Sequence, residues 1–278
     1  MSFLLAILLV AGRFPVDLNG LQKYEAAWSE PKPAAALVDE ARAEFGNRGV
    51  EVADYFLKHT EPRPRNDAYF FVLRAVGDTE TALVLIRALP NPPTHESGTL
   101  DRHFGEVEAA IRAVLETNDP VRADPRIVSA LLEAVATARA KPYGTGMHIT
   151  LAAIGLLGLC RSTDAAKALQ VLAANADAQI RTAVANALGR LTETPETQPT
   201  QQASPVTTLL HILKADPNAE ARRQAAESLG GLNAGEPTIV AELRSVLSTE
   251  KDPQVVDAII QGLTARAPPF KIRGSAAS

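Results

Sequence analysis

A group of apolar and small residues recurs three times at fixed offsets in the C-terminal part of the chain. Each copy ends on a leucine, and the eighth, fourth and first positions before that leucine are also small or apolar. The copies are Ile180, Val184, Ala187 and Leu188; Ala221, Ala225, Ser228 and Leu229; and Val255, Ile259, Gly262 and Leu263. These offsets place four residues on one face of a helix with 3.6 residues per turn. The pattern predicts equivalent amphipathic helices, the signature of a repeat protein.

Residues at both ends of these helices indicate where each one starts and stops. An aspartate precedes each helix, at Asp177, Asp216 and Asp252. An aspartate there can accept hydrogen bonds from the unpaired N–H groups of the first turn. Pro217 and Pro253 follow directly, at a position where the missing N–H of proline is not needed. Gly189 and Gly230 follow the anchor leucines and are interpreted as helix ends.

Each predicted helix also follows a second amphipathic segment. Apolar residues fall at i, i+3, i+4 and i+7 in 206–213, at i, i+4, i+7 and i+8 in 239–247, and more weakly in 165–172. The repeating unit is therefore helix, turn, helix, and neighbouring units must stack because neither helix can bury its stripe alone. Aromatic residues make up only 5% of the chain, and no alternating strand pattern is present. We expect an all-α fold, a right-handed α-solenoid of stacked helical hairpins.

The spacing of the copies defines the expected boundaries. The anchors are 34 residues apart from Leu229 to Leu263 but 41 apart from Leu188 to Leu229, and the excess lies in the Thr-, Pro- and Gln-rich segment 192–205. That composition predicts a surface loop. We expect repeats over 161–266, a divergent helical region over 13–160 and a flexible tail over 267–278.

The same offsets continue more weakly toward the N-terminus. They fit residues 68–77, which precede a helical run over 79–89, and residues 149–158. Segment 127–135 also fits, but Val135 and Leu157 are only 22 residues apart, too few for two hairpins. Segment 125–140 can instead be the first helix of one hairpin, so the register over 100–160 stays open.

These columns resemble the HEAT family, in particular its short bacterial HEAT-like type. The segments that carry the resemblance are DAQIRTAVANALGRL (177–191) and DPNAEARRQAAESLGGL (216–232). The resemblance is good over about 164–266 and loose over 66–160. It implies an armadillo-like superhelix. It also implies a ladder between repeats, with Asp177 and Arg181, then Asp216 and Arg222, in the places of its aspartate and arginine. Val256 replaces the arginine in the third copy, as expected of a terminal repeat.

Catalytic motifs are scarce. His95, Glu96, Asp101 and His103 fall in or beside the segment 94–103, where His95, Glu96 and His103 are weak metal-ligand candidates. Asp101 is better explained as a helix cap. The chain has no H-E-x-x-H pair, phosphate loop or G-x-S-x-G turn, and Cys160, its only cysteine, lies in an apolar run. HEAT-like iron hydroxylases carry repeated His-Glu pairs, whereas His95-Glu96 is the only such pair here. We therefore expect no enzyme activity and no cofactor.

Charge and the N-terminal residues bear on partners and location. The 28 basic and 32 acidic residues are mixed, and basic residues do not cluster as phosphate binding requires, so nucleic acid is excluded as a partner. Residues 3–11 (FLLAILLVA) are too short for the roughly 20 residues of a membrane span. They are typical of the apolar part of a secretory signal over 1–12, although no Lys or Arg precedes them. We expect a periplasmic or secreted protein; the alternative is a cytoplasmic one whose first helix docks on the solenoid.

The resulting functional hypothesis is a non-catalytic scaffold that binds a protein of unknown identity. The second helices would line a concave groove, and the candidate binding residues there are Arg181, Arg190, Arg222, Arg223 and Gln224. The two ladder arginines can alternatively be purely structural. Two other classes stay open: a metal-binding or lyase-type HEAT-like enzyme that uses the segment 94–103, and a structural subunit of an envelope assembly.

Overall fold

The computed structural model describes Tyr24 and residues 35–58, 65–91, 100–192, 205–232 and 237–264. Across these residues the secondary structure is helical and includes no strand, which confirms the predicted all-α class. The predicted secretory signal, most of the 192–205 loop and the predicted tail lie outside them and stay predictions. The chain forms two compact units, residues 1–88 with 92–117 and residues 89–91 with 118–278, and each is described by itself.

The first unit consists of two rows of helices. One row is α4 (Ala35–Phe45), α6 (Arg65–Val76) and α8 (Leu100–Thr117), and the other is α5 (Gly49–Lys58) and α7 (Thr79–Ala88). Helices α6 and α7 confirm the helices predicted over 68–77 and 79–89. Helix α8 carries a further copy of the repeat pattern that was not predicted from the sequence; its members are Val107, Ile111, Val114 and Leu115, all fully buried. Aromatic rings fill this core, with Tyr24 stacked on Phe71 at 5.2 Å between centroids.

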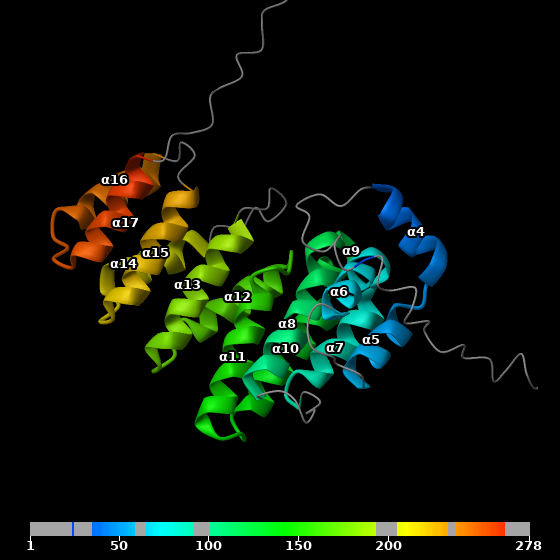
Figure 1. Cartoon of the computed structure of the whole chain (residues 1–278). Coiled ribbons are helices and arrows are strands. Elements are labelled where there is room, and N and C mark those ends of the chain that lie inside the picture. The colour runs from blue at the N-terminus through cyan, green and yellow to red at the C-terminus, as the bar shows by residue number, and fades with distance from the viewer. Residues whose placement is uncertain are drawn as a thin grey trace, which may run out of the picture. The chain divides into compact units, whose positions relative to one another are not determined.

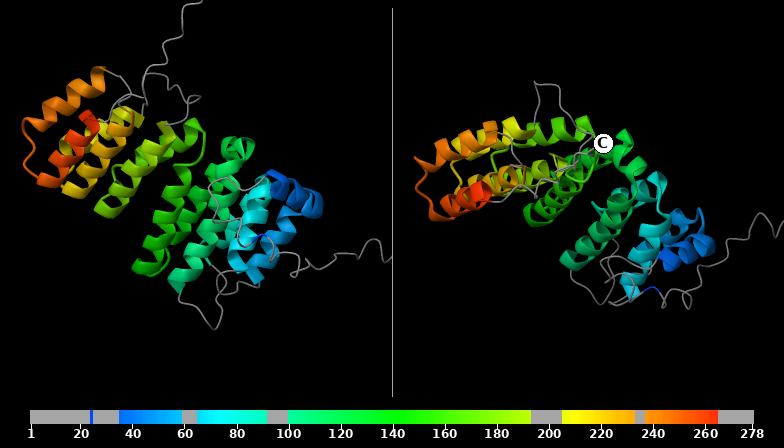
Figure 2. Two further views of the ribbon diagram at one scale, coloured as in Figure 1. Left: turned by 45° about the horizontal axis from the view of Figure 1, so that its top comes forward. Right: turned by 90° about the horizontal axis from the view of Figure 1, so that it is seen from above.

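The second unit begins with the short helix α9 (Asp119–Ala123) and continues as four helical hairpins. The first helices of the hairpins are α10 (Pro125–Ala138), α12 (Thr163–Leu172), α14 (Pro205–Ala215) and α16 (Pro237–Leu247). The second helices are α11 (Tyr143–Leu157), α13 (Ala178–Thr192), α15 (Ala219–Leu232) and α17 (Pro253–Thr264). Each set forms its own row, so the unit has two layers (Figures 1 and 2). This stacking confirms a HEAT-like solenoid of hairpins.

The predicted columns form the core of the second unit. Leu188 and Leu229 are fully buried, whereas Leu263 is half-buried, because no described helix follows α17. Leu157 takes the anchor position in α11, where Ile149, Ala153 and Leu156 are buried at the expected offsets. Helix α10 is the first helix of the hairpin that α11 completes. This explains why Val135 and Leu157 are so close in the sequence, and it settles the register of residues 125–157.

The interpretation of Gly189 and Gly230 as helix ends is wrong. Helix α13 continues to Thr192 and α15 to Leu232, so both glycines lie inside helices. A Cβ added to Gly189 would lie 2.8 Å from the Cβ of Ser228, and one added to Gly230 would lie 2.6 Å from the Cα of Gly262. No side chain fits at these distances. The glycines therefore allow neighbouring second helices to approach closely, and the small residue before each anchor receives them.

Candidate protein-binding surface

Three equivalent turns connect the first and second helices of the last three hairpins. They are Asn175-Ala176-Asp177, Asp216-Pro217-Asn218 and Glu250-Lys251-Asp252. In each turn the side chain of the first residue accepts a hydrogen bond from the backbone N–H of the third, at 2.8, 2.9 and 2.9 Å. The side chain of the third residue then caps the second helix. This geometry defines which residues of the turns are equivalent.

The turns confirm two predicted caps and correct the third. Asp177 accepts a hydrogen bond from the N–H of Gln179, and Asp252 from those of Gln254 and Val255. Helix α15 is capped by Asn218 instead, whose side-chain oxygen accepts from the N–H of Ala221. Asp216 is therefore equivalent to Asn175 and Glu250. Its carboxylate is left to interact with another repeat.

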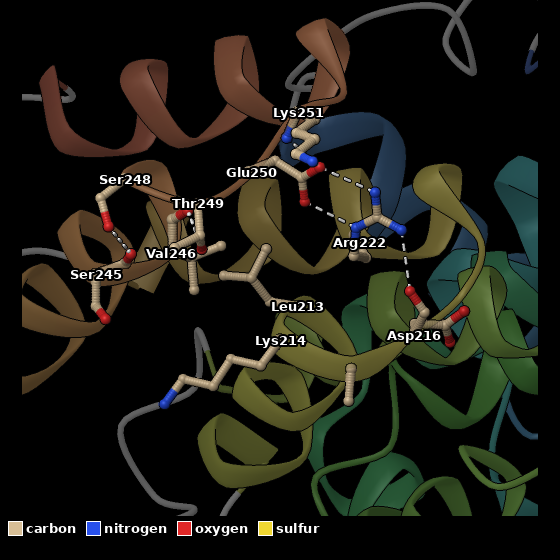
Figure 3. Close-up of a pocket in the computed structure, with 11 residues that line it drawn as sticks. Leu213, Lys214, Asp216, Arg222, Ser245, Val246, Ser248, Thr249, Glu250 and Lys251 are labelled. Carbon is tan, nitrogen blue, oxygen red and sulfur yellow. Dashed lines mark hydrogen bonds and ion pairs between the residues drawn. The ribbon is translucent and has the colours of Figure 1, made fainter.

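An arginine ladder links these turns. Arg181 donates to both carboxylate oxygens of Asp216, at 2.7 and 2.8 Å, and to the backbone oxygens of Asn175 and Ala176 in its own turn. Arg222 repeats the arrangement one hairpin later. It donates to both oxygens of Glu250, at 2.8 and 3.0 Å, and to the backbone oxygen of Asp216 at 3.0 Å (Figure 3). Each guanidinium thus binds its own turn and the carboxylate of the next, a bidentate geometry that arginine favours.

The ladder differs from the one implied by the family resemblance in its acidic partners. Arg181 reaches Asp216 as expected, but Arg222 binds Glu250, because Asp252 is used as a helix cap. Asp177 accepts a hydrogen bond from the hydroxyl of Tyr143 at 2.8 Å instead of pairing with an arginine. The Arg181 and Arg222 side chains are only 12% and 18% exposed. Both guanidiniums are therefore used in contacts within the chain, which favours the structural alternative that the sequence had left open.

Burial and hydrogen bonding shift the pKa values of the ladder carboxylates in opposite directions. Burial raises the pKa of Asp216, but hydrogen bonds from Arg181 and from the N–H of Asn218 outweigh this effect, and the pKa lies below its usual value. Hydrogen bonds from Arg222 lower the pKa of Glu250 to about 2, against the opposing effect of its burial. Both carboxylates are therefore held in their charged form.

Acidification is expected to weaken the ladder. A carboxylate with a lowered folded-state pKa contributes its full stability above its unfolded pKa, near 4.5 for Glu250, and loses it as the pH falls toward about 2. Glu250→Gln cannot ionise, so we expect it to be less stable than the wild type by about 2 kcal/mol at pH 7 and by much less near pH 2. Urea unfolding at several pH values measures the difference. A gap that does not change with pH would contradict this assignment.

An open hollow of about 660 Å³ lies beside the ladder, between the ends of α14 and α16. Ser245, Ser248, Thr249 and Lys214 line it together with the Arg222–Glu250 pair (Figure 3). Several of these groups already bind within the chain. The Ser248 hydroxyl donates to the backbone oxygen of Ser245, and Lys214 pairs with Glu242. Much of the polarity of the hollow therefore comes from pairs formed within the chain.

The side of the second helices opposite the buried stripe forms a different surface. We call it the outward face, and it consists of Gln179, Thr182, Asn186 and Arg190 of α13; Glu220, Arg223 and Glu227 of α15; and Gln254, Asp257 and Gln261 of α17. Most of these residues are exposed and the rest are half-buried. Apart from Arg190, they stand nine, six and two positions before the anchor leucine, which on a helical wheel is opposite the core columns.

The candidate residues do not form one site. Arg190 is exposed in the last turn of α13. Arg223 lies between Glu220 and Glu227 on α15 and pairs with both; the hydrogen bond to Glu220 and the negative charges of both glutamates raise its pKa. Gln224 is half-buried, on the side of α15 toward the preceding repeat. Of the five candidate residues, only Arg190 and Arg223 therefore belong to the outward face.

Sequence reasoning missed the carboxamide and carboxylate groups of this face. Gln179, Asn186, Gln254, Asp257 and Gln261 make no side-chain hydrogen bond or ion pair with the rest of the described chain. Their positions nine, six or two residues before the anchor leucines follow from the columns, so the same periodicity could have identified them.

The C-terminal hairpins have a counterpart among known families. Residues 206–273 match the family model of HEAT repeats. The match spans α14 to α17, where the ladder from Arg222 and the close approach at Gly230 are found. No curated protein matches the chain. Among solved structures, the crystal structure of an engineered protein is 18% identical, with 88% of this chain and 95% of that chain covered and a TM-score of 0.41.

The described residues also bear on metal, thiol and membrane chemistry. No group of three His, Cys, Asp or Glu side chains there could hold a metal ion. His95, Glu96 and the side chain of His103 lie outside them, so that prediction stays open. Burial raises the pKa of the Cys160 thiol to about 12, which makes it unreactive. None of the described helices is both long and apolar enough to cross a membrane.

Proposed function

We propose that this chain is a non-catalytic HEAT-like scaffold that binds another protein through the outward face of α13, α15 and α17. The observation that carries the proposal is the distribution of polar side chains over the second unit. Apart from Lys251, the charged and amide side chains at the turns are used by the ladder and the caps, whereas six on the outward face have no partner within the described chain. Stacked repeats offer extended surfaces of this kind to binding partners.

The chemistry of the outward face favours a protein over a nucleic acid. Its two cations, Arg190 and Arg223, are outnumbered by three carboxylates, and Arg223 is already paired with two of them. Phosphate backbones require several available cations close together. The unpaired carboxamides can donate and accept hydrogen bonds at once, as polar protein surfaces require. A partner with exposed backbone or polar side chains fits this surface.

Changing the outward face is expected to weaken capture of a partner. The full chain is immobilised and an extract of its native cells is passed over it, with bound proteins identified by mass spectrometry. Arg190→Glu combined with Asp257→Lys reverses two exposed charges on α13 and α17 and is expected to weaken binding at least tenfold, equivalent to about 1.4 kcal/mol. The change removes no contact within the described chain.

A matched charge reversal away from this surface is the control. Lys167→Glu in α12 changes an exposed cation, 66% of whose side chain is accessible, on the row of first helices. It is expected to bind as the wild type does. The proposal fails if no protein is captured, or if the outward-face variant and the Lys167 variant retain the captured protein equally.

A further inference from the structure

The second helices α13, α15 and α17 contact their neighbours at both ends. At the turn end, Arg181 and Arg222 each bind the carboxylate of the following turn, and we call each such pair a rung. At the opposite end, the glycine after each anchor meets the small residue before the next anchor, as Gly230 meets Gly262. Two contacts at opposite ends hold both the distance and the angle between neighbouring helices. The hairpins from α12 to α17 are therefore held as one body.

The contact of α11 with α13 keeps the glycine of this arrangement. Gly158 directly follows the anchor Leu157, and a Cβ added to Gly158 would lie 2.8 Å from the Cα of Ala187. Ala187 stands directly before the anchor Leu188, in the same place as Gly262 before Leu263. The two helices are thus held closely at the end that lies away from the turn.

The rung of this contact is missing, because both of its members are replaced. Thr150 stands seven residues before the anchor of α11, where α13 and α15 have arginine. Its hydroxyl donates to the backbone oxygen of Gly146 in its own helix, at 2.8 Å. Asn175 takes the place of the acidic residues Asp216 and Glu250, and it has no charge. A charge-assisted pair between these two positions is therefore excluded.

The turn end of α11 and α13 is also more open to solvent than its counterparts. The hydroxyl of Tyr143 donates to Asp177 at 2.8 Å and links the two hairpins there, but Tyr143 is 72% exposed. Ile180, eight residues before its anchor, is half-buried, whereas the equivalent residues of the other second helices are buried: Ile149, Ala221 and Val255. Val184, one turn further along α13, is buried. The looser packing is therefore confined to the turn end.

We propose that the contact between α11 and α13 is a joint, at which the body from α12 to α17 turns against the α10–α11 hairpin. The pivot is the close contact of Gly158 with Ala187, and the turn ends separate and approach. Opening breaks the exposed hydrogen bond from Tyr143, whereas the same motion at α13–α15 or α15–α17 would separate a largely buried ion pair. Closure of one packed body against another about a fixed point is a common form of conformational change.

The joint does not depend on the proposed binding function. The outward face lies on α13, α15 and α17, which are all on one side of the joint, so its residues move together. A partner that also contacts the α10–α11 hairpin would bind one angle of the joint more tightly than the others and shift the population toward it.

The test is the spread of distances between spin labels in the full chain. Glu133→Cys in α10 with His211→Cys in α14 spans the joint, and Lys167→Cys in α12 with Arg244→Cys in α16 lies within the body; all four positions are exposed. Each pair skips one hairpin, and the buried Cys160 takes up no label because its thiol is unreactive. Pulsed electron resonance is expected to give a distribution about twice as broad for the first pair as for the second.

Exchanging the residues of the rung tests the cause. Thr150→Arg with Asn175→Asp rebuilds a rung at the joint and is expected to narrow the distribution of the first pair to the width of the second. Arg222→Thr with Glu250→Asn copies the joint into the contact of α15 with α17, and is expected to broaden the distribution of the second pair. Thermal melting checks that each variant folds.

Equally narrow distributions for the two pairs in the wild type would overturn the proposal. A rebuilt rung that folds and leaves the first distribution broad would also overturn it, because the missing rung would then not be the cause. If the buried position of Thr150 does not accept arginine and that variant fails to fold, the copied joint decides: an unchanged distribution of the second pair overturns the proposal.

Discussion

Gly230→Ala is expected to destabilise the C-terminal hairpins by about 2 kcal/mol, and Gly230→Leu by considerably more. A Cβ at this position would lie 2.6 Å from the Cα of Gly262, which is backbone and cannot turn away. Helices α15 and α17 must therefore move apart, and the core between them loses contacts. Urea unfolding followed by circular dichroism measures the loss.

The adjacent glycine is a matched control. A Cβ added to Gly231 would meet no atom within 4 Å, and the residue is exposed near the end of the same helix. Alanine is a better helix former than glycine, so Gly231→Ala is expected to leave stability unchanged or to raise it by up to about 1 kcal/mol. Equal effects of the two substitutions would show that close packing at Gly230 is not required.

Asp216→Ala is expected to lower the free energy of unfolding by about 3 kcal/mol, because it leaves the largely buried Arg181 guanidinium without its carboxylate. The side chain of Asp216 is only 4% exposed, and its oxygens also accept the turn N–H of Asn218. Asp216 is thus part of both the ladder and its own turn. Chemical unfolding at neutral pH measures the effect.

Breaking an exposed ion pair provides the comparison. Lys167 pairs with Asp164 at 3.3 Å, and both side chains are more than half exposed, so Lys167→Ala is expected to cost less than about 0.5 kcal/mol. Replacing Arg181 and Asp216 together by apolar residues of similar size is expected to recover much of the loss, since no buried charge then remains unpaired. An Asp216→Ala protein as stable as the Lys167 variant would contradict a structural role for the ladder.

The core of the second unit could be predicted from the sequence because burial and periodicity are directly linked. A residue four or eight positions before Leu188 lies on the same helical face as Leu188 whatever the neighbouring repeats do. The copy in α8, from Val107 to Leu115, fits the same offsets and could have been predicted in the same way.

The outward face could be predicted only in part. Its position follows from the columns, but Arg181 and Arg222 looked as available in the sequence as Arg190. What separates them is a carboxylate 35 residues further on for Arg181 and 28 for Arg222. No local pattern indicates such a pair, because its spacing depends on the length of the intervening loop and helix.

In the last three hairpins the sequence by itself determined which segments are helices, how they pair and which stripe of each is buried, because these follow from a period of 3.6 residues. Only the tertiary structure decided the roles that depend on a neighbouring repeat. A glycine after an anchor has the same sequence signature at a helix end and at a close contact, and Glu250 and Asp252 are both acidic residues before α17. Stacking separates these roles, because it brings together atoms of different repeats.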